Sequence, residues 1–159
     1  MKHLPLMLAL GLMLTASPAA GRKRQPAPQQ IPILAWYSIP PGVFATQEHY
    51  QELRDAGFTH SFSHTYKYDD AIQALDLCAK VGLKCVFMCS ELEKEPEATA
   101  RKVSRHPGLG AYFLRDEPGN DAMPDLGLWA RRIESVDKEH PCYLNLLPEH
   151  AFPSIDAYR

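Results

Sequence analysis

Two acidic residues, Asp116 and Glu117, stand directly after an apolar, aromatic-rich run that begins at Leu109. Such a run is typical of a buried strand, and α/β barrels keep their catalytic carboxylates at the carboxyl ends of buried strands. Pro118 disfavours a helical backbone at the residue before it, so we expect Glu117 to be extended, with its side chain aimed. Glu117 is therefore the first candidate for an acid or base catalyst. The alternative is that both carboxylates belong to a loop that starts the next helix.

Two histidines and several aromatic residues accompany the other apolar runs of the chain. His60 and His64 lie four residues apart near the end of the second run, on one face if that segment stays extended. Trp36 and Tyr66 stand near the ends of the first and second runs, where an aromatic face could stack on a ligand. Together with Asp116, these side chains form the predicted substrate-binding set. For each of them, an ordinary role in the core or at the rim is the alternative, and the sequence predicts no metal and no cofactor.

Five apolar runs recur at a nearly constant separation, beginning near residues 33, 59, 84, 110 and 142. Helical patterns fill the intervals, and strands that alternate with helices predict βα units and a parallel sheet. The runs are continuously apolar, as in sheets that are covered on both faces. The predicted helices extend from Thr46 to Ala56, from Asp69 or Asp70 to Gly82, from Glu95 to before His106, and from about Pro124 to Lys138.

Two α/β folds fit this pattern. A five-stranded doubly wound domain needs a further helix to cover its last strand. A (β/α)8 barrel needs roughly 250 residues, and the chain has 159. We predict that residues 31–159 form the amino-terminal half of a (β/α)8 barrel, with about five strands and four helices, truncated after the fifth strand. Its first and fifth strands would be unpaired edges, which favour association with other chains.

The amino-terminal residues predict export. Residues 1–20 combine a basic start, the short apolar run Leu4–Leu14 and a small-residue cleavage site near Ala19 or Ala20, as in a secretory signal peptide. Residues 21–30 are basic and then rich in Pro and Gln, which predicts a disordered leader. We therefore expect a secreted or periplasmic protein without a membrane anchor. The formal net charge of −2 gives no broad basic face for nucleic acid.

The four cysteines are predicted to be buried free thiols, although pairing is the alternative in an exported protein. They are Cys78, Cys85, Cys89 and Cys142. Their spacing fits neither a zinc site nor an iron–sulfur cluster.

The segment Phe113–Pro118 resembles the Asn-Glu-Pro signature that ends the fourth strand in a large clan of (β/α)8 glycoside hydrolases. Trp36-Tyr37 and the segment Ala56–His60 also look like the opening of such a barrel. The likeness is nearest to exported bacterial proteins related to the family 42 β-galactosidases. It implies that Glu117 is the general acid/base and that Asp116 stands where the clan has a sugar-binding Asn. The clan's nucleophile lies on a seventh strand, beyond the five predicted here.

The resemblance implies a retaining glycoside hydrolase that acts on an oligo- or polysaccharide when its barrel is complete. The alternative is a non-catalytic barrel remnant or a glycan-binding protein, and the 159-residue chain alone is expected to be inactive. Retaining enzymes need two carboxyls about 5–5.5 Å apart, whereas inverting enzymes place them roughly 6.5–9.5 Å apart. Further carboxylates that follow predicted strands are Asp69, Asp70, Glu91, Glu93 and Glu149, each of which is more simply a helix-cap or loop residue.

Overall fold

Strands and helices alternate along residues 31–148, the residues that this computed structural model describes. The strands are β1 (Leu34–Ala35), β2 (His60–Ser61), β3 (Lys84–Phe87), β4 (Leu109–Asp116) and β5 (Cys142–Asn145). The helices are α1 (Gln47–Asp55), α2 (Tyr68–Val81), α3 (Ser90–Lys94), α4 (Pro96–Val103), the 3-10 helix η1 (Asn120–Ala122) and α5 (Met123–Glu134). The predicted signal peptide (1–20), the leader (21–30) and Glu149 lie outside the described residues.

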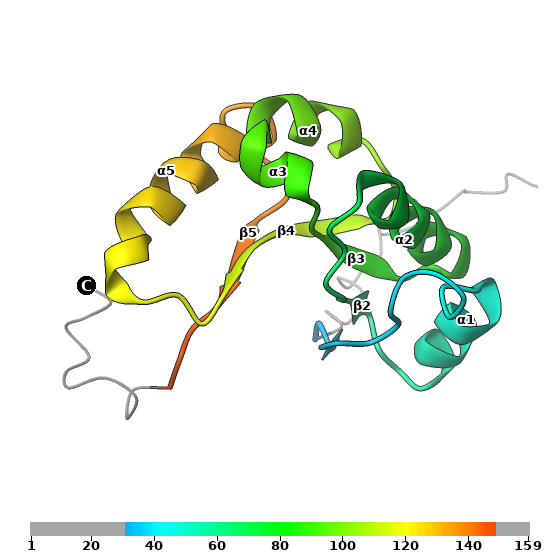
Figure 1. The fold of residues 1–159 in the computed structure, drawn as a ribbon. Helices are drawn as coiled ribbons and strands as arrows, with labels where there is room; N and C mark the ends of the chain where they lie inside the picture. Colours follow the sequence, from blue (N-terminus) through cyan, green and yellow to red (C-terminus); the bar gives the residue numbers. More distant parts are fainter. Residues whose placement is uncertain (1–30, 149–159) are drawn as a thin grey trace, which may run out of the picture. The chain divides into compact units, whose positions relative to one another are not determined.

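The five strands form one all-parallel sheet in the order in which they occur along the chain. The register pairs Leu34 with His60, His60 with Lys84, and Tyr112 with Cys142. A doubly wound sheet reverses its strand order at a switch point, so the sequential order excludes that alternative. The sheet curls into about half of a barrel, which confirms the predicted fold class (Figure 1).

The helices lie on the outer side of the curled sheet (Figure 1). A core between sheet and helices joins Leu75 of α2, Tyr112 of β4 and Ile133 of α5, all fully buried. A separate cluster, the concave cluster, comes from the strands and the residues directly after them. Its members are Phe62, Val86, Ala111 and Phe113, with Leu34, Trp36, Met88 and Tyr143 packed against them. Because alternate strand residues point to opposite faces, the sheet separates a helix-covered core from a barrel interior.

Local sequence signals explain where the first two helices begin or end. The Thr46 hydroxyl accepts a hydrogen bond of 3.3 Å from the backbone nitrogen of His49 and so caps α1, as predicted. Gly82 ends α2 with φ 76°, a left-handed conformation that glycine adopts without strain. The helix start inferred at Thr46 and the helix stop inferred at Gly82 are therefore confirmed.

The structure differs from the predicted helices at α3 and at the end of α5. Helix α3 was not predicted, because five residues with one buried apolar side chain, Leu92, give no periodic stripe. Tertiary contact stabilises it, since the Trp129 indole donates a hydrogen bond of 2.9 Å to the Leu92 carbonyl. Helix α5 ends at Glu134 rather than Lys138, because the Asp137 carboxylate accepts hydrogen bonds from the backbone of the following turn.

All four cysteines lie within the described residues and are free thiols. Three of them, Cys78, Cys85 and Cys89, are buried, and Cys142 is half-buried. Burial raises the pKa of Cys89, and likewise that of Cys142, to about 11. These two thiols are therefore protonated, and weak nucleophiles, at neutral pH.

Candidate functional site

Glu117 follows β4 directly, and its backbone has φ 44°. The expectation that Pro118 holds it extended is therefore wrong. The chain must turn sharply from β4 into η1 at this point, while the Glu117 backbone nitrogen donates a hydrogen bond of 2.7 Å to the Asn145 carbonyl of β5. This bond fixes the backbone in the left-handed region and leaves the Glu117 side chain exposed.

Asp116 is half-buried and belongs to the last pair of the β4–β5 ladder. Its Oδ1 accepts a hydrogen bond of 2.8 Å from the Asn145 side-chain amide. One carboxylate oxygen of Asp116 is thus held by β5, whereas Glu117 presents its carboxylate to solvent. The two acidic residues share one anchor residue but differ in environment.

Four aromatic rings form the inner surface: two directly follow β1 and β2, and two lie within β4 and β5, where they are paired in the register. We call them the aromatic floor: Trp36, Phe62, Phe113 and Tyr143. The Trp36 ring centroid lies 4.7 Å from that of Phe62, 5.7 Å from that of Phe113 and 6.2 Å from that of Tyr143. Trp36 is half-buried and joins the other three rings, so the structure places this predicted site residue on the concave side.

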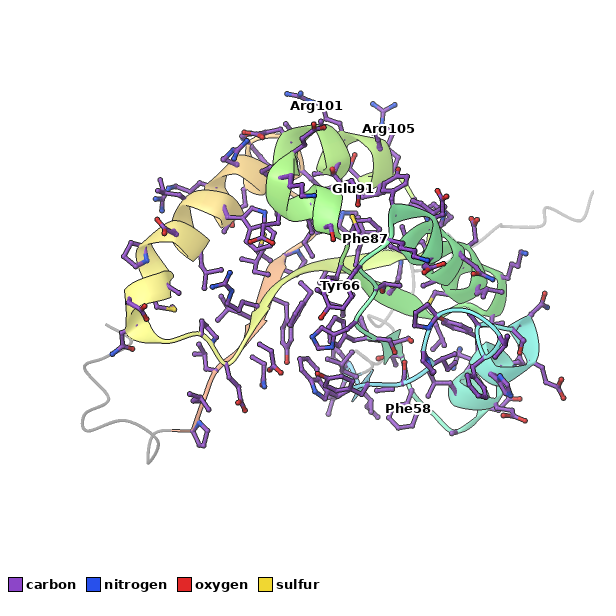
Figure 2. All side chains as sticks on the ribbon, in the orientation of Figure 1. Phe58, Tyr66, Phe87, Glu91, Arg101 and Arg105 are labelled. Carbon is purple, nitrogen blue, oxygen red and sulfur yellow. The ribbon has the colours of Figure 1, made fainter. Side chains whose placement is uncertain are left out.

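His64 lies against the aromatic floor. Its ring centroid is 5.1 Å from that of Phe62 and 5.7 Å from that of Phe113. Tyr66, which is labelled in Figure 2, is 62% exposed. Its ring stacks on that of His64 with the centroids 6.2 Å apart. The His64 Nδ1 atom is buried and has no hydrogen-bonding partner among residues 31–148. The structure thus brings Trp36, His64 and Tyr66 together, with one buried ring nitrogen that has no partner among the described residues.

His60 and Ser61 are the two residues of β2, and the register pairs His60 with Leu34 and Lys84, the first residues of β1 and β3. The His60 Nδ1 is 2.8 Å from the Thr59 hydroxyl, and its ring lies beside Gly110 near the start of β4. Burial and the neighbouring Lys84 cation lower its pKa. Because strands rise ~3.3 Å per residue, the eight-residue β4 separates this level from Glu117 by roughly 20 Å. His60 and the carboxyl-end residues therefore belong to different ends of the sheet.

The backbone conformation of Tyr37 could not be predicted from the sequence. It follows β1 with φ 50° and is 59% exposed. The backbone nitrogen of Ser38 donates a hydrogen bond of 2.8 Å to the Phe62 carbonyl, which fixes the turn just after Tyr37. The Tyr37 ring lies 4.7 Å from that of His64, so it extends the aromatic surface. The only sequence signal for it is its place beside Trp36 at a strand end.

The other predicted carboxylates that the structure describes stand in the first turns of helices. Asp69 and Asp70 begin α2, and Glu91 and Glu93 begin α3, where a negative charge stabilises the helix dipole. Glu93 also forms an ion pair of 3.7 Å with Arg115, which is therefore paired away from Glu117.

Comparisons of the chain with known proteins identify no relative. No family model matches the chain, and comparisons with curated proteins and with solved structures give no significant match. Within residues 31–148, no three His, Cys, Asp or Glu side chains are grouped so that they could hold a metal ion. None of the helices described here is long and apolar enough to cross a membrane.

Proposed function

We propose that the carboxyl ends of the strands form a carbohydrate-binding site, and that Glu117 is the general acid/base of a retaining glycoside hydrolase. The observation that carries the proposal is the backbone at Tyr37 and Glu117. Among the described residues, Tyr37 and Glu117 are the only ones other than glycine that have a positive φ. Such conformations cost about 1–3 kcal/mol each and cluster at ligand sites, where the surroundings hold them. Here both residues follow a strand at the same end of the sheet, and both are exposed.

The surface between these two residues has the chemistry of a sugar site. Aromatic faces offer apolar area for the C–H face of a sugar ring, and Trp36, Tyr37 and Tyr66 supply them with a polar atom at each rim. The unpartnered Nδ1 of His64 can hydrogen-bond a hydroxyl, either as donor or as acceptor depending on its tautomer. The second oxygen of Asp116 can accept a further hydrogen bond from a sugar hydroxyl.

In the proposed reaction, the Glu117 carboxylic acid protonates the glycosidic oxygen as the bond to the leaving group breaks. A second carboxylate attacks the anomeric carbon, and Glu117 then removes a proton from the water that hydrolyses the glycosyl ester. That second carboxylate would stand about 5–5.5 Å from Glu117. It would come from a strand outside the five described, because Asp116 is held by Asn145 and the carboxylates of α2 and α3 begin helices.

A second candidate function is glycan binding without hydrolysis. It is favoured by a different observation, namely that the described strands contribute one unengaged carboxylate, Glu117, at this end of the sheet. Binding and hydrolysis are separable, because Glu117→Gln removes the exchangeable proton and keeps the size of the side chain.

The binding site can be tested with the two tryptophans, which lie on opposite sides of the sheet. Trp36 belongs to the aromatic floor and Trp129 to the outer core. In a Trp129→Phe variant, we expect soluble galacto-oligosaccharides to change the remaining emission in a saturable way. In the matched Trp36→Phe variant, which keeps Trp129, emission should stay constant. Equal responses of the two variants, or no response to any soluble glycan, would contradict the proposed site.

A further inference from the structure

We propose that Asp116 selects a substrate that carries a positively charged amino group, namely an amino sugar without an acetyl group. The inference rests on the proposed function and names the substrate class of that site. Two observations support it. An extra residue in β4 turns Asp116 toward the barrel interior, and no cation among residues 31–148 is paired with it there.

Strand β4 contains one residue more than β5 between two paired positions. The register pairs Phe113 with Tyr143 and then Asp116 with Asn145, which is three steps along β4 but two along β5. Two residues of β4 therefore stand opposite one of β5, which makes this part of β4 a β-bulge. Because side chains alternate between the two faces of a sheet, one extra residue exchanges the faces of all residues after it.

The two bulged residues, Leu114 and Arg115, both face the helices. Leu114 belongs to the core between sheet and helices, and Arg115 forms an ion pair of 3.7 Å with helix α3. Asp116 faces the interior, because its Oδ1 accepts the 2.8 Å bond from the side-chain amide of Asn145. Asn145 lies two positions after Tyr143 of the concave cluster, hence on the same face. Without the extra residue, the alternation would turn Arg115 inward and Asp116 outward.

The two cations of the described strands are engaged elsewhere. Arg115 is paired with α3, and Lys84 donates a hydrogen bond of 2.8 Å to the Pro107 carbonyl at the amino ends of the strands. Asp116 forms no ion pair within residues 31–148. It is therefore a half-buried carboxylate on an otherwise aromatic face, with a neutral amide as its partner.

The loops that follow the strands add further negative charge at this end of the sheet. In these loops and in the first turns of the helices after them, the exposed Lys67 is the only Lys or Arg within residues 31–148. Such an excess of one sign attracts ligands of the opposite charge. The acidic residues in the same loops and turns are Glu48, Asp69, Asp70, Glu91, Glu93, Glu117, Asp121 and Asp125.

An ammonium group fits these surroundings better than a hydroxyl or an acetamide group. The second oxygen of the Asp116 carboxylate can only accept, and a hydrogen bond between an ammonium and a carboxylate is roughly twice as strong as one between neutral groups. The exposed rings of Tyr37 and Tyr66 attract cations to their π faces. Independently of the carboxylates, the buried Nδ1 of His64 has no partner among residues 31–148, and a hydroxyl of the same sugar would satisfy it.

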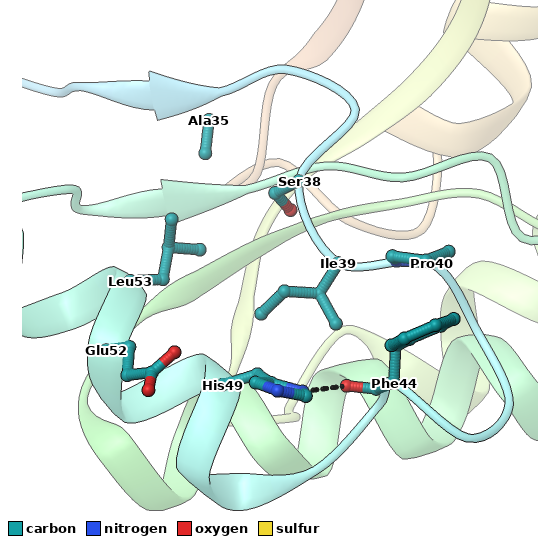
Figure 3. A pocket seen from close by; sticks show the side chains of 8 residues that line it. All are labelled: Ala35, Ser38, Ile39, Pro40, Phe44, His49, Glu52 and Leu53. Carbon is teal, nitrogen blue, oxygen red and sulfur yellow. Dashed lines mark hydrogen bonds between the residues drawn. The ribbon is translucent and has the colours of Figure 1, made fainter.

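An apolar groove of about 500 Å³, between the segment after β1 and helix α1, is the alternative site for a cation (Figure 3). Glu52 is the one carboxylate among its lining residues, and the His49 ring nitrogen is bonded to the Phe44 carbonyl at 2.8 Å. The groove lies on the helix side of the sheet, away from the aromatic floor. A substitution at Glu52 therefore separates the two locations.

Calorimetric titration of the chain with matched oligosaccharides tests the selection. Each β-1,4-linked tetramer is offered with an amine, an acetamide or a hydroxyl at carbon 2, in gluco and in galacto configuration. In the configuration that binds better, we expect the amine form to bind about tenfold more tightly than the other two forms. Asp116→Asn keeps the size of the side chain and the acceptor for Asn145. It should abolish the preference and leave the affinity for the hydroxyl form nearly unchanged, and Asp116→Ser provides a second neutral variant.

Asp121→Asn and Glu52→Gln are the matched controls, because each removes one negative charge away from the interior face. Both should keep the preference, and circular dichroism melts check that all variants fold. Equal binding of the three forms by the wild-type chain would overturn the selection of an amine and leave the glycan site standing. So would a preference that the Asp116 variants keep, or one that the controls reduce as much. If none of the tetramers binds, the glycan site fails, and this inference fails with it.

Discussion

The side-chain amide of Asn145 donates a hydrogen bond of 2.8 Å to the Asp116 carboxylate, at the point where β4 and β5 end together. The Asn145 carbonyl accepts a second bond, of 2.7 Å, from the backbone nitrogen of Glu117. The register between the two strands shifts after Phe113 and resumes at the Asp116–Asn145 pair. Asn145 therefore holds both acidic residues of the candidate site in place.

Asn145→Ala is expected to lower the free energy of unfolding by about 1 kcal/mol, the typical contribution of one hydrogen bond. It should also speed amide hydrogen exchange at Glu117, because the end of β5 is no longer tied to β4. Urea titration and exchange measured by NMR check the two effects. Asn120→Ala, on the exposed 3-10 helix, is the matched control and should change the stability by less than about 0.5 kcal/mol. Unchanged exchange at Glu117 would show that Asn145 does not hold it.

Glu117→Gly is expected to raise stability and to impair the proposed activity. The native φ of 44° is strained for glutamate and free of strain for glycine, so the gain should be about 1 kcal/mol. Thermal melts measure it. Glu91→Gly, in the first turn of α3, should instead lose roughly 0.5–1 kcal/mol. A loss of stability in both variants would mean that the backbone at Glu117 is not strained.

In a protein whose barrel is complete, Glu117→Gln is expected to lower glycoside hydrolysis about 10²–10⁴-fold, because a glutamine cannot deliver the proton. The loss should be smaller for activated aryl glycosides, whose leaving groups depart without protonation. Initial rates on both substrate types measure the difference, with Glu91→Gln as the control. Equal losses on both would indicate that Glu117 only holds its loop.

Most of the fold could be predicted from the apolar runs and from the residues at helix ends. Each of the five predicted strands is present, although β1 and β2 have only two residues each and β5 is half-buried throughout. Thr46 and Gly82 mark helix ends through local backbone chemistry, which a sequence displays directly.

The site was less visible in the sequence because its geometry comes from long-range contacts. Glu117 adopts a left-handed backbone because of a bond to Asn145, 28 positions further along, and no local pattern reports that bond. His60 lies level with the first residues of β1 and β3, because β2 contains only two residues, and this register is not visible in any local pattern.

Gly108→Ala is expected to destabilise the protein by about 1–3 kcal/mol or more through overpacking. A Cβ at this position would collide with the backbone carbonyl of Leu75, where α2 approaches β4, and backbone atoms cannot move aside. Gly119→Ala is the matched control. Its Cβ would meet only the carboxylate of Asp121, 2.6 Å away on an exposed side chain that can rotate. Urea unfolding of both variants checks the difference, and similar stabilities would contradict the close approach of α2.

Asp137→Asn is expected to destabilise the protein at neutral pH by about 1–3 kcal/mol. Asp137 is 5% exposed, and its carboxylate accepts hydrogen bonds from the Tyr112 hydroxyl at 2.7 Å and from the His140 ring at 2.8 Å. Burial alone would raise its pKa, but the hydrogen bonds from Tyr112, from the backbone of Glu139 and from His140 outweigh burial and lower it.

The pH dependence follows from that direction. A carboxylate whose pKa is lowered by folding adds stability above its unfolded value of about 3.9. The contribution is lost as the pH falls through that value toward the folded pKa. The difference between wild type and Asp137→Asn should therefore be full at pH 7 and shrink below about pH 4. Asp121→Asn, on an exposed carboxylate, should show no such pH dependence, and a constant difference for Asp137→Asn would contradict the assignment.

The sequential strand order lets this sheet be built while the chain is still being synthesised. Paired residues in neighbouring strands are 24 to 30 positions apart, so each new strand closes a loop of similar length at a similar entropic cost. Among the five described strands, none has to insert between two that are already paired. A nascent chain that has emerged from the ribosome as far as Lys138 would already contain four strands in their final order, with an open place for β5.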